Sequence, residues 1–370
     1  MMNVPKLRFK EFTDEWQHDK ICNVTTYVDY RGKTPNKTET GIFLVTAKNV
    51  KKGYIDYDCS KEYVAEIEYE EIMHRGKPKV GDVLITTEAP CGNVAQIDKE
   101  NIALAQRVIK YRGNALIDNT FLKYEFLSNY FQNELKKVTS GGTVSGVKGS
   151  ILHNMEIHYC SKEEQLMLSS FLTLLDKKIE LQTKKIEDLK LYKLCLKNRV
   201  FNESGMLRYK LNNLCCCKAS NINLLDIEFD NGKFPIYGAT GEIKKISTFQ
   251  FSDNYIAIVK DGASVGKNII CDGNSSIIAT MSAIIPNKIP IYYFNELIEN
   301  INFSKYIVGS GIPHIYFKDY STETVKIHNR PRMKLIDSIF YDLSRKITYE
   351  EDKLKKLFQL KKGLMQNMFV

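Results

Sequence analysis

The chain has 370 residues, of which 43% are hydrophobic and 26% are charged, so it can bury the cores of two or three domains. Its formal net charge of +9 permits a polyanionic partner, although a solvated basic surface explains the same excess. We expect neither a signal peptide nor a membrane span, because charges occur from the first residues and no run approaches the ~20 apolar residues that cross a bilayer.

The first part of the chain, up to about residue 158, has the pattern of a mixed α+β domain. Short runs rich in β-branched residues predict strands, and glycines between them predict turns. The runs are residues 42–45, 82–87 and 104–110, and the glycines are Gly32, Gly53 and Gly81. A short amphipathic helix is predicted over residues 119–135.

The clearest periodicity follows at residues 163–201, where seam positions recur at alternating steps of three and four. These positions are Leu172, Leu175, Ile179, Gln182, Ile186, Leu189, Lys193, Leu196 and Val200. The opposite face is charged, and no Pro or Gly interrupts the run. The pattern predicts a heptad helix, and at ~1.5 Å per residue it would be nearly 60 Å long.

A second mixed α+β region follows this helix. Residues 255–260 and 277–285 predict strands, residues 291–300 predict a short helix, and the turns are expected at Gly232, Gly241 and Gly273.

The heptad pattern returns at the C-terminus, and each seam position of the second helix lies the same number of residues after its counterpart in the first. The positions are Phe340, Leu343, Ile347, Glu350, Leu354, Leu357, Lys361, Leu364 and Met368. The polar breaks match as well, Gln182 with Glu350 and Lys193 with Lys361. Polar seam residues weaken a coiled coil but fix its register, so we expect the two helices to pair in one alignment. Two unrelated amphipathic helices are the alternative, but they would have no reason to share the breaks.

Each helix is the last part of a larger unit that occurs twice in the chain. LRFK at residues 7–10 corresponds to LRYK at residues 207–210, and MEIH at residues 155–158 corresponds to TVKIH at residues 324–328. We therefore predict a domain at residues 1–158, a helix at 159–201, a second domain at 202–328 and a second helix at 329–370. Between the shared landmarks the two halves differ in sequence and length, which suggests one scaffold with two specificities.

In its motifs and their order the chain resembles the DNA-specificity (S) subunits of type I restriction-modification systems. The first half carries PKLRFKEF at residues 5–12, GDVLITTE at 81–88, AQRV at 105–108, EEQ at 163–165 and LDKKIE at 175–180. The second half carries PIYGATG at 235–241 and LKKGLMQ at 360–366. The second helix departs from the family, because NRPRM at residues 329–333 replaces the usual acidic-Gln start.

The resemblance implies a cytoplasmic, non-catalytic protein with two target-recognition domains, each of which reads one half of a bipartite site in double-stranded DNA. It implies that the two helices pair antiparallel as a coiled coil, set the gap between the half-sites and dock two methyltransferase subunits. S-adenosylmethionine would bind to those partners and not to this chain, and a motor-nuclease subunit would join for restriction.

Physical arguments agree with this role. Half-sites one helical turn apart lie ~34 Å from each other on one face of the duplex. A helix of nearly 60 Å can hold two domains at such a separation, whereas the ends of a flexible linker would fluctuate.

The candidate DNA-binding residues are polar or cationic residues in loops beside strand ends. In the first domain they are Arg31, Lys33, Thr34, Lys48, Asn49, Thr86, Thr87, Ser140, Thr143, Ser145 and Lys148. In the second domain they are Thr240, Lys260, Ser264, Lys267, Ser310, His314 and Lys318. Each could equally be an ordinary solvated residue, because nucleic-acid contacts are spread over many positions.

Motifs for chemistry are weak or absent. Residues 261–268 resemble a phosphate loop, but the spacing is one residue short and Asn268 replaces the required Ser or Thr. The six histidines lack metal-ligand spacing, and the matched positions of His158 and His328 favour a structural role. The nine cysteines lack the regularity of a disulfide framework or a zinc site, so reduced thiols are expected.

Two other functions remain open at this stage. One is a self-contained DNA methyltransferase or nuclease with its own recognition domains, although the Pro-Asp nuclease motif and the Pro-Pro-aromatic methyltransferase motif do not occur. The other is a coiled-coil adaptor that binds only proteins, which would leave the two divergent domains unexplained.

Overall fold

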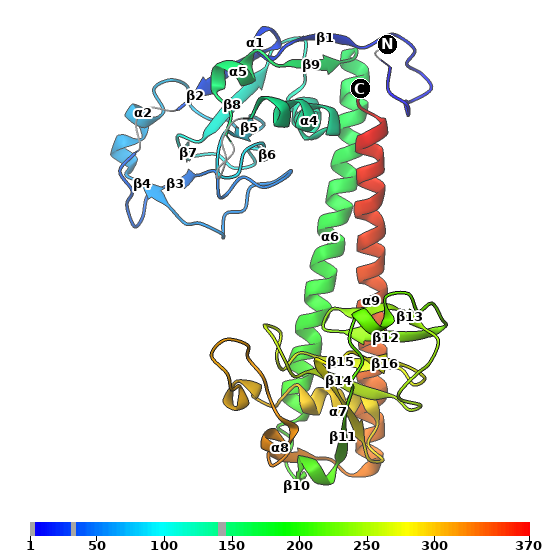
Figure 1. Ribbon diagram of the computed structural model, residues 1–370. Coiled ribbons are helices and arrows are strands. Elements are labelled where there is room, and N and C mark those ends of the chain that lie inside the picture. Colours follow the sequence, from blue (N-terminus) through cyan, green and yellow to red (C-terminus); the bar gives the residue numbers. More distant parts are fainter. Residues whose placement is uncertain (1–3, 31–34, 140–145) are drawn as a thin grey trace. The chain divides into compact units, whose positions relative to one another are not determined.

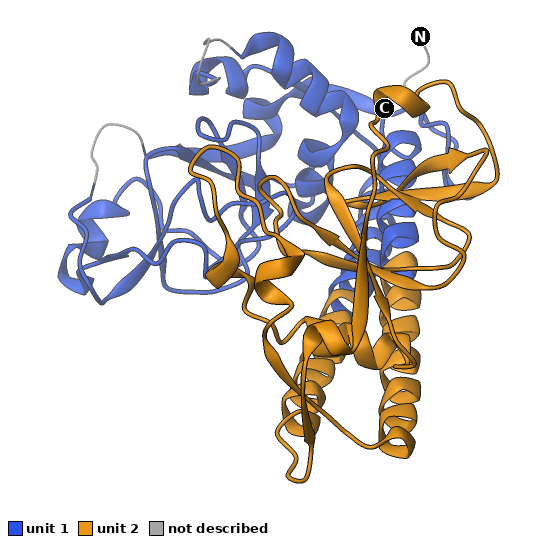
Figure 2. Ribbon diagram, turned by 60° about the horizontal axis from the view of Figure 1, so that its bottom comes forward, with its two compact units in different colours: residues 1–181, 353–370 blue, residues 182–352 orange. Residues whose placement is uncertain are grey.

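The computed structural model describes residues 4–30, 35–139 and 146–370. The chain forms two compact units, the first from residues 1–181 and 353–370 and the second from residues 182–352 (Figure 2). Both long helices contribute residues to both units. Each unit is described by itself.

The described residues of unit 1 form three small sheets. Their orders are β1-β9, β2-β8-β5-β6 and β4-β3-β7, and β3–β7 is parallel while every other pair is antiparallel. The strands are β1 (Gln17–Lys20), β2 (Thr25–Asp29), β3 (Ile42–Val45), β4 (Tyr63–Val64), β5 (Val83–Thr86), β6 (Val94–Gln96), β7 (Ile102–Leu104), β8 (Val108–Gly113) and β9 (Glu156–Tyr159). Residues 104–110, predicted as one strand, thus belong to two strands separated by a turn.

The helices of unit 1 are α1 (Ile21–Val24), η1 (Glu66–Glu68), α2 (Tyr69–Ile72), α3 (Asn119–Leu127), α4 (Asn129–Val138), α5 (Gly149–His153) and α6 (Lys162–Val200). Among the short helices of unit 1, α4 lies beside the long helix α6, whereas α2 lies at the opposite side of the unit (Figure 1). The single helix predicted over residues 119–135 was wrong. Ser128 has extended backbone, and its hydroxyl accepts a hydrogen bond from the Phe131 amide, so it ends α3 and caps α4.

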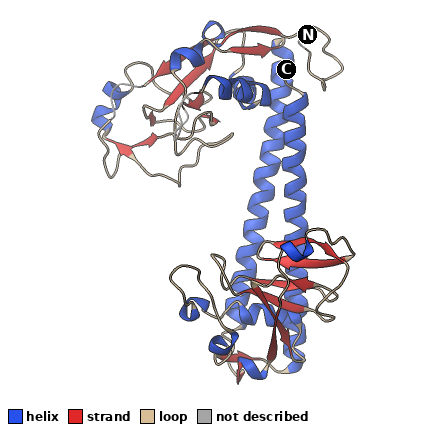
Figure 3. Cartoon of the chain, in the orientation of Figure 1, coloured by secondary structure: helices blue, strands red, loops and turns tan. Residues whose placement is uncertain are grey.

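Unit 2 repeats this sheet plan, and its strands are drawn in red in Figure 3. Its sheets have the orders β10-β18, β11-β17-β14-β15 and β13-β12-β16, and β12–β16 is the one parallel pair among the described strands of unit 2. The strands are β10 (Leu207–Lys210), β11 (Cys215–Ala219), β12 (Phe234–Gly238), β13 (Gly241–Ile246), β14 (Tyr255–Val259), β15 (Asn268–Cys271), β16 (Ser276–Ile277), β17 (Met281–Pro286) and β18 (Thr324–Ile327). The strand predicted over residues 277–285 is divided between β16 and β17.

The helices of unit 2 are short except for α9. They are η2 (Leu211–Asn213), η3 (Leu225–Ile227), α7 (Ile291–Ile298), η4 (Phe303–Tyr306), α8 (Phe317–Tyr320) and α9 (Arg330–Asn367). Matching strand orders in the two units confirm that the internal repeat is a repeat of fold. The mixed α+β class predicted from the sequence is confirmed as well.

The C-terminal end of the chain completes the core of unit 1. Phe369 is buried against Trp16 and Phe121, with ring centroids 6.0 and 5.8 Å apart. The amide of Leu7 donates to the Asn367 carbonyl at 2.8 Å. Residues that are far apart in sequence therefore share one core.

Unit 2 uses the end of α6 in the same way. Phe201 follows that helix and packs against Tyr293 of α7, with centroids 5.4 Å apart. Phe201 and Phe369 are separated by the same 168 residues as the seam positions, and each packs into an aromatic core just beyond the end of a long helix.

In each unit, α6 and α9 pack side by side and run in opposite directions (Figure 1). In unit 1, Leu175 and Ile179 form an apolar cluster with Leu357. In unit 2, the Gln182 side-chain amide donates to the buried Glu350 carboxylate at 2.7 Å, and Lys185 forms an ion pair with the same carboxylate. These contacts are consistent with the predicted antiparallel coiled coil, and the matched polar breaks Gln182 and Glu350 meet each other.

Candidate nucleic-acid interface

Two loops of unit 2 meet beside the end of β14. One is residues 260–267, between β14 and β15, and the other precedes α8. The Gly262 amide donates to the Pro313 carbonyl, and the Ile315 amide donates to the Lys260 carbonyl, both at 2.9 Å. Backbone hydrogen bonds therefore hold the two loops together as one surface.

The second loop contains a small hairpin. Val308 and His314 exchange two backbone hydrogen bonds of 2.9 Å, which close the five residues between them into a loop. Gly309 has a φ of +94°, and a Cβ there would lie 2.6 Å from the Ile312 carbonyl oxygen. The hairpin therefore requires glycine at this position.

Six of the seven second-domain candidates lie on these two loops or on α8. They are Lys260, Ser264, Lys267, Ser310, His314 and Lys318. Ser264, Lys267, Ser310 and Lys318 are exposed, whereas Lys260 and His314 are half-buried. The seventh, Thr240, is exposed at the separate turn between β12 and β13.

Unit 1 has a corresponding pair of loops at the equivalent strand end, but their residues differ. The loop after β5 is held to the segment before α5, because the Val147 amide donates to the Thr87 carbonyl at 3.0 Å. An ion pair of 3.4 Å joins Glu88 to Arg107 across this loop. Lys148, a predicted contact, is exposed just beyond the junction.

Three first-domain candidates have structural roles, which corrects the expectation that they face DNA. Asn49, Thr86 and Thr87 are fully buried. The Asn49 amide group accepts from the Thr46 amide and donates to the Asp56 carbonyl, and the Thr86 hydroxyl accepts from the Asn93 amide. Their hydrogen-bonding groups are used to hold turns. Lys48, in the same turn as Asn49, is exposed.

Six further candidates lie outside the described residues. They are Arg31, Lys33, Thr34, Ser140, Thr143 and Ser145. They stay predictions.

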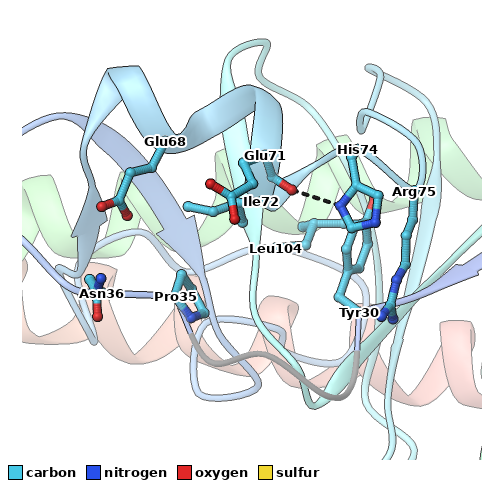
Figure 4. A pocket seen from close by; sticks show the side chains of 9 residues that line it. All are labelled: Tyr30, Pro35, Asn36, Glu68, Glu71, Ile72, His74, Arg75 and Leu104. Carbon is cyan, nitrogen blue, oxygen red and sulfur yellow. Dashed lines mark hydrogen bonds between the residues drawn. The ribbon is translucent and has the colours of Figure 1, made fainter.

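Sequence reasoning missed a cavity of about 210 Å³ in unit 1 (Figure 4). Its lining includes Tyr30, Glu68, Glu71, His74 and Arg75, and the His74 Nδ1 lies 2.7 Å from the Glu71 carbonyl oxygen. Most of these residues come from the single segment 68–75, but no motif in that segment indicated the cavity. Its carboxylates suit hydrogen-bond donors better than phosphates.

The alternatives of metal or nucleotide chemistry receive no support from the described residues. No three His, Cys, Asp or Glu side chains gather as metal ligands in residues 4–30, 35–139 and 146–370. The segment at 261–268 leads into the strand β15, whereas a phosphate loop leads into a helix. All nine cysteines are free thiols.

The two matched histidines are buried at corresponding places, His158 within β9 and His328 directly after β18. The His158 amide donates to Glu125 at 3.2 Å, and the His328 amide donates to the Tyr293 hydroxyl at 3.1 Å. Burial lowers the pKa of both imidazoles. These contacts agree with the structural role predicted for them.

No helix in the described part of the chain is both long enough and apolar enough to cross a bilayer.

Comparison with known proteins points to one family. Residues 14–191 match the family model described as the type I restriction modification DNA specificity domain. The type I restriction enzyme MjaIX specificity subunit of Methanocaldococcus jannaschii is 23% identical over 360 residues, covering 85% of this chain and 82% of that protein.

Solved structures support the fold. The type I restriction-modification S subunit from M. genitalium matches with a TM-score of 0.72 and 17% identity, covering 99% of each chain. A chain from a structure on complex assembly and conformational transition of the type I R-M system matches with a TM-score of 0.51 and 16% identity, covering 95% of this chain and 96% of the other. The family match over residues 14–191, the duplicated fold and these relatives agree: the chain is similar along its length to the DNA-specificity subunits of type I restriction-modification systems.

Proposed function

We propose that this chain reads a bipartite target in double-stranded DNA, one half-site with each globular domain, and that it catalyses no reaction itself. The observation that carries this proposal is the repeated sheet plan with different loops at the same strand ends. A shared scaffold fixes where the loops lie, and their differing side chains would select different bases.

The proposed domain limits follow the repeat. Residues 1–158 and 202–328 are the target-recognition domains, and residues 159–201 and 329–370 are the helical segments between and after them. α6 is one continuous helix of 39 residues, and such a helix extends for ~58 Å. We propose that the helices set the gap between the half-sites.

The helices would also dock the partner subunits. Large apolar side chains are exposed along them, among them Leu174 and Leu191 of α6 and Tyr349 and Phe358 of α9, each more than half exposed. Exposed apolar residues that gather on one element mark protein contacts. Two methyltransferase subunits, one for each repeat, would bind here and carry S-adenosylmethionine, and a motor-nuclease subunit would join for restriction. Because its proposed target is the host's DNA, we propose that the protein acts in the cytoplasm.

The direct test is to map methylated adenines across the host genome with and without this gene. We expect one bipartite motif with a fixed gap to lose its methylation when the gene is deleted. An unchanged set of motifs, with the partner subunits expressed, would contradict the proposal.

A second measurement separates this function from the two alternatives. The purified chain, incubated with labelled S-adenosylmethionine and DNA, should transfer no methyl group until the methyltransferase subunit is added. Transfer without the partner would indicate a self-contained enzyme. An assembled complex whose binding to DNA is absent at every salt concentration would indicate a protein-only adaptor.

A further inference from the structure

We propose that the hairpin at residues 309–313 of unit 2 enters the major groove and that Ile312 at its tip contacts the methyl group of a thymine in one half-site. The inference rests on the proposed function and goes further, because it assigns a base contact to an apolar residue. Major-groove readout of thymine uses apolar side chains in this way, since thymine alone of the four bases presents a C5-methyl group there.

The tip is apolar although it is exposed. Ile312 is 69% exposed, and Val308 and Tyr316 on the same segment are 43% and 49% exposed. A single exposed isoleucine would need no explanation. Three large apolar side chains within nine residues, on a loop that packs them into no core, indicate a surface that another molecule covers.

The tip is also held in place. The backbone pair of Val308 and His314 closes the hairpin, and the Gly262 amide ties Pro313 to the neighbouring loop. His314 Nδ1 lies 3.1 Å from the Ile312 carbonyl oxygen. A side chain on a loop that is already ordered loses little conformational entropy when it binds.

The surroundings of the tip favour DNA over an apolar protein partner. Lys318 lies with its Nζ 5.5 Å from the centre of the Tyr316 ring. Lys267 is exposed on the adjoining loop, and Lys260 joins that loop to the base of the hairpin. The carboxylates of Asp261 on the adjoining loop and of Asp319 on α8 are both half-buried. Cations around an apolar tip can bind phosphates on both sides of a groove while the tip reaches the bases.

The small residues of the hairpin fit a close approach. Gly309, Ser310 and Gly311 precede Ile312, so only the isoleucine extends a large side chain from the tip. In Figure 1 the hairpin is part of the orange loop that leads into α8. Sequence reasoning selected polar residues here and passed over Ile312.

The test uses the complex of the chain with its methyltransferase partner and duplexes that carry the mapped target. Each thymine of the target is replaced in turn by uracil, which lacks the C5-methyl group but keeps the base pair. At one position we expect wild-type binding to weaken about fourfold, the loss for one buried methyl-sized group. The Ile312→Ala variant should bind thymine and uracil duplexes equally at that position.

Ile67 offers a matched control, because it is 91% exposed on η1 of unit 1. The Ile67→Ala variant should keep the wild-type response to uracil. Circular dichroism and retention of the partner subunit would show that both variants fold.

Two results would overturn the inference. If no uracil substitution distinguishes wild type from Ile312→Ala, the isoleucine contacts no thymine methyl. If Ile312→Ala loses the partner subunit while DNA binding is unchanged, the tip is a protein contact. A wild-type complex without any sequence-specific binding would overturn the proposed function itself, which separates that failure from the other two.

Discussion

The two long helices begin with the same kind of contact but with the charges exchanged. The interval of 168 residues that separates Gln182 from Glu350 also separates Glu164 from Arg332. At the start of α6, the Glu164 carboxylate accepts two hydrogen bonds from Arg8, of 2.8 and 2.7 Å. At the start of α9, Arg332 donates to the Glu203 carboxylate at 2.5 and 3.3 Å.

The repeat therefore preserves an ion pair and not a residue type. This explains why the second helix lacks the acidic start of the first. An acidic residue suits the positive end of a helix dipole, whereas Arg332 does not. Asn329 offsets this by capping α9, because its side-chain oxygen accepts a hydrogen bond from the Arg332 amide at 3.0 Å.

The two ion pairs differ most in burial. The side chains of Arg8 and Glu164 are 11% and 1% exposed, whereas those of Arg332 and Glu203 are 42% and 33% exposed. A buried charge that loses its partner is costly, and an exposed one is screened by water. The same contact should therefore matter much more in unit 1 than in unit 2.

The largest effect is expected for Arg8→Ala. The substitution leaves the Glu164 carboxylate buried without its cation, and we expect unit 1 to lose about 3 kcal/mol of unfolding free energy. Chemical denaturation, followed by the fluorescence of Trp16 in the core of unit 1, measures the loss. If Arg8→Ala lowered the unfolding free energy by less than Arg332→Ala does, burial would not explain the difference between the two ion pairs.

A second difference between the units should appear as a pH dependence. Unit 1 uses Glu125 where unit 2 uses Tyr293 to accept the histidine amide. Burial raises the pKa of Glu125 to about 8, although the hydrogen bond from the His158 amide opposes the rise. Because the folded pKa lies above the unfolded one, this group contributes full stability below about pH 4.5 and loses it as the pH rises through 8.

Glu125→Gln should remove that loss. We expect the variant to exceed wild type by on the order of 2 kcal/mol at pH 9, because each pKa unit is worth about 1.4 kcal/mol and relaxation around the ionised carboxylate offsets part of the total. Near pH 4 the two proteins should unfold alike. Denaturation curves of unit 1 at both pH values provide the measurement, and a gain of equal size at pH 4 would rule out ionisation as its cause.

The smallest effect is expected for Arg332→Ala. Both partners are largely open to solvent, so the loss of unfolding free energy in unit 2 should be far smaller than that for Arg8→Ala. Removal of a cation from the start of α9 should reduce the loss further. Thermal unfolding of wild type and variant at low and high salt measures this loss, since the attraction between exposed charges weakens as the ionic strength rises. A loss of several kcal/mol that salt does not change would show that this pair is as critical as the buried one.

The sequence predicted the long helices well because their heptads are uninterrupted and their polar breaks recur. It predicted the shorter elements less well. β-branched residues indicated strands at 104–110 and 277–285 but carried no signal for the turns inside them. Ser128 looked like an interior helix residue, although its hydroxyl serves as a cap.

The candidate interface shows a similar limit. Strand-end loops were the right place to search in unit 2, since β14 and the hairpin bring six predicted residues onto adjoining loops. Polarity alone could not separate side chains that face solvent from those, like Asn49, that hold a turn. It also excluded Ile312, because an exposed apolar residue becomes informative only when its neighbours in space are known.

The core that Phe369 shares with Trp16 has a consequence for how the protein is made. Residues 353–370, which unit 1 needs, are synthesised only after all of unit 2. At 5–20 residues per second the ribosome takes roughly 10–30 s to add that unit. During this time Trp16 and Phe121 lack their contact with Phe369, so we expect the core of the nascent first domain to stay incomplete until residues 353–370 have been added.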